Sequence, residues 1–322
     1  MNTWMWVGVL LIAVWASHWG AEHLATPLKK LRRRWGLSGV AGGALVGVAT
    51  ASPEIAINIT SAIRGVSDIG LGAVLGNNLV SLPLTLAVGY MSYRTSGNTS
   101  GRELPLERQT VSVQVLPYLA VLALVGLLML PPSWRGLQAV DGWILLGAYG
   151  LYMAQALFRG RAEGEQVQWQ RKEILLALAG LLVLALGAYF SVRATEQIIS
   201  ALGISKLVGG LFITGTISAL PETFSTWSVM RTEQRTAAVT TVLGDQVTTL
   251  TVGLLPLALI GLSLQDVHLF WVSLVALATM AGAFGALIGV RQPSVNGWKV
   301  SAVAGLYAAY IAVVLVWVLG VV

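Results

Sequence analysis

Long apolar runs recur along the chain, and they are the feature that most limits how it can fold. Many approach or exceed about 18 residues, long enough to cross the hydrocarbon core of a bilayer as a helix. Only 11% of the 322 residues are charged, against about 25% in soluble domains. Lipid offers the backbone no hydrogen-bond partner, so spans of this length must be helical. The sequence therefore predicts an all-α polytopic membrane protein.

Ten candidate spans can be placed between the polar loops. They lie at about 3–25, 38–62, 68–92, 110–130, 138–158, 173–193, 206–230, 236–261, 268–290 and 298–320. The loops after the odd-numbered spans hold 16 of the 20 Lys and Arg residues, and the rest of the chain holds four. Because cytoplasmic loops are enriched in Lys and Arg, this split predicts that both termini face outward.

The basic residues lie in short loops between apolar runs, which is typical of membrane topology and argues against nucleic-acid binding. The expected partners are inorganic cations and the lipid bilayer. Short loops and the lack of a recognisable targeting segment favour a prokaryotic inner (plasma) membrane. The oligomeric state is open, and a monomer is compatible with the sequence. The chain has no Cys, so no thiolate metal site is possible, and no cofactor is expected.

The two halves of the chain resemble each other. "WGLSGVAGGALVGVATASPE" (35–54) parallels "LGISKLVGGLFITGTISALPE" (202–222), and both end in Pro-Glu. Each Pro-Glu segment is followed, at the same spacing, by a second polar segment: "LGNN" in the first half and "LGDQ" in the second. After five spans, an odd number, the chain lies on the opposite side of the membrane from where it began. The second copy of the unit must therefore have the inverted orientation in the membrane. The sequence predicts ten transmembrane helices arranged as two inverted five-helix repeats.

This pattern also predicts the organisation into domains. The first repeat is expected at 1–160, with its core segment at about 36–85. The second is expected at 173–322, with its core segment at about 203–256. A cytoplasmic linker at 161–172 would join them.

Three of the 14 acidic residues lie well inside predicted spans: Glu54, Glu222 and Asp245. A charge near the bilayer centre costs about 2.5–3.5 kcal/mol on insertion scales. No basic residue lies at a comparable depth to pair with them. We expect the three acids to face one another and bind cations, since carboxylates are hard oxygen donors. The alternative is that they are protonated and only hydrogen-bonded.

Prolines and neutral polar residues surround these acids. Pro53 and Pro221 each precede a glutamate, disfavour helix at the residue before them and remove one backbone donor. A helix broken near the midplane exposes carbonyls that can coordinate cations, although a simple kink is the alternative. Thr50, Ser218 and Thr249 each lie one helical turn from one of the acids, and Asn77 and Ser81 lie one turn from each other in the span after Glu54. These five residues are the candidate neutral oxygen ligands.

The first predicted span carries His18, Glu22 and His23 toward its cytoplasmic end. These histidines could relay protons. A structural or interfacial role is the favoured interpretation.

The segments "SPEIAINITSAIRGVSDIGLGAVLGNN" (52–78) and "LPETFSTWSVMRTEQRTAAVTTVLGDQ" (220–246) resemble the two repeats of the cation/Ca²⁺ antiporter superfamily, which includes the sodium/calcium exchangers. The resemblance covers about 45 residues closely in each half, and the five-plus-five layout extends it over the chain. It implies ten helices, alternating access and ion sites at the centre of helices 2, 3, 7 and 8.

The resemblance also assigns residues, with some departures. The two family glutamates fall on Glu54 and Glu222, and the helix 3 positions fall on Asn77 and Ser81. In helix 8 the exchangers usually carry an acid at the position of Thr249, but this chain carries Asp245 one turn earlier. The first repeat is also one residue short: Gly43 to Glu54 spans 11 positions, whereas Gly210 to Glu222 spans 12.

The sequence hypothesis is a secondary antiporter, not an enzyme, that exchanges a divalent cation, most consistent with Ca²⁺, for Na⁺ or H⁺. Glu54 and Glu222 would be the central ligands and Asp245 the third charge. Three carboxylates in a low-dielectric site are costly when empty, and either a divalent ion or several monovalent ions can neutralise them. The alternatives are a degenerate family member acting as a channel, sensor or scaffold, and an intramembrane hydrolase that uses two acids to activate water.

Overall fold

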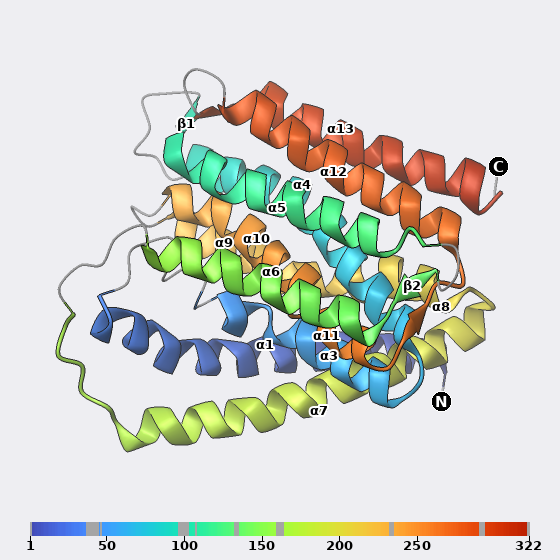
Figure 1. Cartoon of the computed structure of the whole chain (residues 1–322), viewed down its shortest axis with the longest axis horizontal. Helices are drawn as coiled ribbons and strands as arrows, with labels where there is room; N and C mark the ends of the chain where they lie inside the picture. Colours follow the sequence, from blue (N-terminus) through green and yellow to red (C-terminus); the bar gives the residue numbers. More distant parts are fainter. Residues whose placement is uncertain are drawn as a thin grey trace.

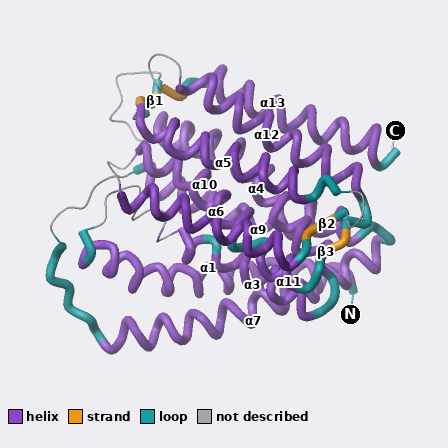
Figure 2. Tube along the Cα trace, in the orientation of Figure 1, coloured by secondary structure: helices purple, strands orange, loops and turns teal. Residues whose placement is uncertain are grey.

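The structure is a computed structural model that describes residues 2–36, 45, 47–95, 103–106, 108–131, 135–158, 164–231, 235–289 and 294–320. Helices dominate these residues (Figures 1 and 2). The elements in chain order are α1 (Thr3–Arg34), α3 (Ser52–Ile63), α4 (Ser67–Thr95), β1 (Leu104–Pro105), α5 (Arg108–Leu128), β2 (Gly136–Leu137), α6 (Ala139–Phe158), α7 (Arg171–Leu202), α8 (Lys206–Gly209), the π-helical segment η1 (Gly210–Thr214), α9 (Gly215–Met230), α10 (Arg235–Thr251), α11 (Leu255–Leu259), β3 (Leu262–Ser263), α12 (Val267–Gly289), β4 (Ser294–Val295), α13 (Gly297–Val313) and the π-helical segment η2 (Val314–Val318).

The helical membrane architecture predicted from the apolar runs is confirmed. Among the described residues, seven helical stretches are long and apolar enough to cross a membrane. The expected span at 38–62 lies partly outside the described residues, and its described part includes the short helix α3. Helix α1 runs nine residues beyond the expected end of the first span, into the basic segment that follows it.

Helix α4 lies at the centre of the molecule. In its most apolar window 83% of the residues are buried, against 17% in α13 at the periphery. Its neighbours include α3, α9, α10 and α12, which come from both halves of the chain. Polar residues on α4 therefore point into the protein interior, where they need partners from other helices.

Glycines allow α4 to lie directly against η1 and the start of α9. A Cβ atom on Gly76 would collide with the carbonyl group of Leu211, and one on Gly215 would lie 2.6 Å from the backbone nitrogen of Asn77. Small residues let membrane helices approach this closely. The contact fixes Asn77 of α4 beside α9, the helix that carries Glu222.

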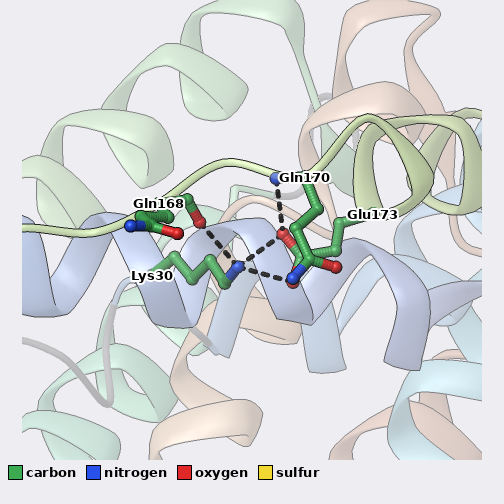
Figure 3. A network of polar contacts seen from close by, with 4 residues as sticks. All are labelled: Lys30, Gln168, Gln170 and Glu173. Atoms are coloured by element: carbon green, nitrogen blue, oxygen red, sulfur yellow. Dashed lines mark hydrogen bonds and ion pairs between the residues drawn. The ribbon is translucent and has the colours of Figure 1, made fainter.

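Helices α1 and α7 form a long pair along one face of the molecule (Figure 1). Their backbones meet at Gly20 and Gly180. Beyond the membrane-spanning parts, the chain before α7 lies along the end of α1. Lys30 of α1 donates to the carbonyl oxygen of Gln168 at 2.9 Å and pairs with the carboxylate of Glu173 (Figure 3).

Two short antiparallel ladders, which the sequence analysis did not predict, join loops that are distant in sequence. Strand β1 pairs with β4, and β2 pairs with β3. Each ladder is only two residues long, too short to leave an alternating apolar pattern in the sequence. The ladders join the loops at the ends of α4 and α12 and those at the ends of α5 and α11.

Candidate cation site

Glu54 lies in the first turn of α3, deep inside the protein. The chain is helical up to Thr50, turns at Ala51 and starts α3 at Ser52, with Pro53 in its first turn. Proline is well accommodated there because the missing N–H has no helical partner in any case. The start of a helix also favours a negative charge. The interruption lies at Ala51, two residues before Pro53, whereas Ser52, where the sequence predicted the departure from helix, is itself helical. Glu54 follows the interruption closely, so a buried carboxylate lies at a helix N-terminus.

The second Pro-Glu segment is built differently. Helix α9 continues through Pro221 without a break, so the expected departure from helix before this proline is not found. The irregularity lies upstream instead, in the π-helical segment η1. A π-helical turn accommodates one extra residue in a helix. It lies between Gly210 and Glu222, the interval that is one residue longer than its counterpart in the first half.

Asn77 of α4 joins the two glutamates. Its Nδ2 atom donates to Oε1 of Glu222 at 2.9 Å and to Oε1 of Glu54 at 3.2 Å. The Oγ atom of Ser81 lies 2.8 Å from both Oε2 of Glu222 and Oδ1 of Asn77, and either can accept its proton. Four of the predicted site residues from three helices thus form one hydrogen-bonded group.

The Oε2 atom of Glu54 is buried and has no hydrogen-bond partner among the described residues. An unpaired buried carboxylate oxygen is costly, so it marks a place where a ligand could be bound. A small cavity, with room for about one water molecule, opens beside this glutamate. The residues lining it are Val14, Ser17, His18, Thr50, Pro53, Glu54, Ile57, Ser218, Pro221 and Glu222.

Asp245 belongs to a separate pair. Its Oδ1 atom accepts a hydrogen bond from Oγ1 of Thr50 at 2.7 Å, which connects α10 to the chain just before α3. Asp245 is 5% exposed. It is not among the residues that line the cavity, although its partner Thr50 is. Asp245 is therefore hydrogen-bonded to a residue of the cavity wall, Thr50, and does not itself line the cavity.

The remaining two predicted ligands have different surroundings. Ser218 lines the cavity, while its hydroxyl donates to the carbonyl oxygen of Thr214 at 2.9 Å. Thr249 donates to the carbonyl oxygen of Gln246 and accepts from Nδ2 of Asn78 at 3.2 Å. Thr249 does not line the cavity.

Sequence reasoning missed two buried amides beside the site. Asn78 and Gln246 each follow a predicted ligand at matching positions of the two halves, in "LGNN" and "LGDQ". Gln246 Nε2 donates to the carbonyl oxygen of Asn78 at 3.0 Å, which links α4 to α10. The sequence signal that could have identified Asn78 and Gln246 is that each of these segments ends in two consecutive polar residues, of which only the first was considered as a ligand.

The donor set is chemically suited to a hard cation. Carboxylate, amide and hydroxyl oxygens are the ligands preferred by Na⁺-like and Ca²⁺-like ions. In the part of the chain that the structure describes, no three His, Asp or Glu side chains already converge on one point. A cation in this cavity would thus be held by the glutamates together with neutral oxygens.

Comparison with known proteins finds related membrane proteins. A curated relative, the candidate antiporter CaxA of Alkalimonas amylolytica, is 24% identical over 234 residues, which cover 67% of each chain. An uncharacterized membrane protein of Methanocaldococcus jannaschii is 22% identical over 67% of this chain and 69% of its own length.

Two kinds of solved exchanger share the fold. The sodium-calcium exchanger NCX_Mj superposes with a TM-score of 0.67 at 19% identity, covering 97% of this chain and 99% of its own. The H⁺/Ca²⁺ exchanger CAX superposes with a TM-score of 0.70 at 14% identity, covering 97% and 80%. The family described as sodium/calcium exchanger protein matches residues 4–158 and 172–316. Its members are transporters and not enzymes, and this chain belongs to that family as an integral membrane antiporter.

Proposed function

We propose that this protein exchanges a divalent cation, most consistent with Ca²⁺, for Na⁺ or H⁺ by alternating access at the cavity between Glu54 and Glu222. The observation that carries the proposal is the placement of these two acids. They come from opposite halves of the chain, border one buried cavity and share Asn77 as a donor, while Oε2 of Glu54 is unpartnered. The empty site favours either one divalent ion or several monovalent ions, and mutually exclusive occupancy gives exchange.

Each predicted ligand then has a role. Glu54 and Glu222 bind the divalent ion directly, and Thr50 and Ser218 offer hydroxyl oxygens from the cavity wall. Asn77 and Ser81 orient the glutamates and exchange these hydrogen bonds for ion contacts. The two remaining residues, Asp245 and Thr249, would join when the helices rearrange during the cycle.

We further propose the complete architecture of ten helices in two inverted five-helix repeats, 1–160 and 173–322, joined by the linker 161–172. The two-part family match, with its gap at 159–171, supports this division. The strand pairing supports the topology, because β1 and β4 lie in loops expected in the cytoplasm and β2 and β3 in loops expected outside. Both termini would face outward from a prokaryotic inner membrane, in accord with the distribution of Lys and Arg.

The test is ion transport by purified protein in liposomes. Ca²⁺ uptake is measured with an outward Na⁺ gradient, with an outward H⁺ gradient and with neither. We expect uptake with one of the two gradients only, and its loss in Glu54→Gln. Glu165→Gln is the matched control, because Glu165 is an exposed acid in the linker.

The outcomes separate the possible functions. Uptake that is independent of any gradient would indicate a channel, and uptake that survives in Glu54→Gln would refute the site. If none of the divalent ions tested is transported by the wild-type protein, the antiporter proposal is wrong, and a degenerate member acting as a sensor or scaffold becomes the better hypothesis.

A further inference from the structure

His18 of α1 lines the same cavity as Glu54 and Glu222, yet α1 supplied no predicted cation ligand. The cavity wall has three parts: α1, the chain around Pro53, and α9. From α1 it receives Val14, Ser17 and His18. Val14 has no polar atom, and the hydroxyl of Ser17 lies against the backbone position of Gly187 on α7. The hydroxyl oxygen of Ser17 is buried without a partner among the described residues, and His18 is the α1 side chain that brings a nitrogen donor to the cavity wall.

A ring contact holds this part of α1 against α9. Trp15 packs on Phe224 with ring centroids 5.5 Å apart. Trp15 lies three residues before His18, on the same helical face, and Phe224 lies two residues after Glu222. The contact therefore joins the turn of α1 that carries His18 to the turn of α9 that carries Glu222.

One ring nitrogen of His18 lies near a carboxylate. Nε2 lies 3.5 Å from Oε1 of Glu22, and the side chain of His18 is 20% exposed. A carboxylate beside one ring nitrogen is the usual arrangement that orients a metal-binding imidazole. Among the described residues, Nδ1 makes no hydrogen bond and remains available.

We infer that His18 sets the cation specificity of this site by adding a ring nitrogen to an otherwise all-oxygen cavity, favouring Zn²⁺-like cations relative to Ca²⁺. Imidazole suits transition metals such as Zn²⁺ and adds little for Ca²⁺, which prefers oxygen. The inference rests on the proposed transport function and concerns which divalent cations the same site accepts. Because His18 and the glutamates border the cavity without converging, the ion itself would draw the ligands together.

The experiment is a competition assay in the liposomes described above. Ca²⁺ uptake is inhibited with Zn²⁺ or with Sr²⁺, and the ratio of the two half-inhibiting concentrations is compared between wild type and His18→Gln. We expect this variant to weaken Zn²⁺ relative to Sr²⁺ by about tenfold, a common loss when a metal-site residue is removed. His23→Gln is the control, because His23 lies on the same helix, stacks on Trp19 at 4.0 Å and does not line the cavity.

A spectroscopic measurement provides the second test, since it does not require the variant to transport. Pulsed EPR of wild-type protein loaded with Cu²⁺, which like Zn²⁺ is suited to imidazole, should detect coupling to a ring nitrogen. His18→Gln should lose this coupling while His23→Gln keeps it. An unchanged Zn²⁺/Sr²⁺ ratio, or the absence of nitrogen coupling in wild type, would overturn the role of His18 and leave the antiporter proposal standing. Failure of the wild-type protein to transport any divalent ion would overturn both.

Discussion

The two Pro-Glu segments share a sequence pattern but use it differently. In the first, the helix is interrupted before Pro53, and Glu54 lies at a new helix N-terminus with one oxygen unpartnered. In the second, the helix runs through Pro221, and both oxygens of Glu222 accept hydrogen bonds from α4. One additional residue, accommodated by the π-helical segment η1, accompanies the difference. The two glutamates are thus chemically unequal: Glu54 is open to a ligand, and Glu222 is held in place.

Among the changes that test the difference between the two Pro-Glu segments, deletion of Ile213 from η1 is expected to have the largest effect on Ca²⁺ uptake. The deletion removes one residue from the interval between Gly210 and Glu222 and, with the π-helical turn retained, should rotate Glu222 by about 100° relative to the preceding chain. Glu222 would then leave Asn77, and Ca²⁺ uptake should fall to background. The measurement is uptake in liposomes, with size-exclusion elution and the melting temperature as checks on folding. Normal uptake would mean that the length of this interval does not set the position of Glu222.

Neutralising Glu54 and Glu222 in separate variants tests whether the two glutamates contribute unequally to cation binding. Glu54→Gln should weaken Ca²⁺ binding about tenfold more than Glu222→Gln, since a difference of about 1.4 kcal/mol corresponds to tenfold. The reason is that only Glu54 presents an oxygen with no protein partner to replace. Binding to the purified variants is measured by calorimetry. Equal losses in the two variants would contradict the distinction.

Two adjacent asparagines provide a comparison between binding and stability. Asn77→Ala should reduce Ca²⁺ affinity, because it removes the donor shared by both glutamates. Asn78→Ala should mainly lower stability, by about 1–3 kcal/mol, because it leaves the buried hydroxyl oxygen of Thr249 without the donor Nδ2 of Asn78. Calcium titration and thermal unfolding of both variants separate the effects. The prediction is wrong if the two variants lose affinity and stability in the same proportion.

Ser81→Ala should have the smallest effect. The hydroxyl of Ser81 supports one oxygen of Glu222 from the same helix as Asn77. A single hydrogen bond of this type contributes about 1 kcal/mol, so Ca²⁺ affinity should change by only severalfold. Thr85→Ala, one turn further along α4, is the control, because its hydroxyl has no partner among the described residues. A loss as large as that of Asn77→Ala would mean that Ser81 itself binds the ion.

Much of the fold followed from the sequence because lipid narrows the possibilities. Apolar runs of spanning length must be helical, and the described residues contain helices at the expected places, such as α4, α6 and α12. The short ladders between β1 and β4 and between β2 and β3 were missed. They depend on contacts between distant loops, which no local pattern records.

The candidate site was predicted in part. The buried acids identified Glu54 and Glu222 because charge is costly in a membrane, and the structure brings both to one cavity. Asp245, the third predicted acid, pairs with Thr50 of the cavity wall at 2.7 Å, and its part in cation binding stays a prediction. The side of a helix on which a carboxylate lies depends on how neighbouring helices pack, which spacing along one helix does not specify.

The sequence by itself determined that this chain spans a membrane with helices, that its halves carry matching Pro-Glu segments, and that two buried glutamates need partners. These conclusions follow from the cost of exposing backbone and charge to lipid, which is local and can be read from residue order. Only the tertiary structure decided that Asn77 bridges the glutamates, that Glu54 keeps an open oxygen and that His18 joins the cavity wall. Those features arise where helices remote in sequence meet, and the close packing at Gly76 and Gly215 fixes the register in which α4 and α9 do so.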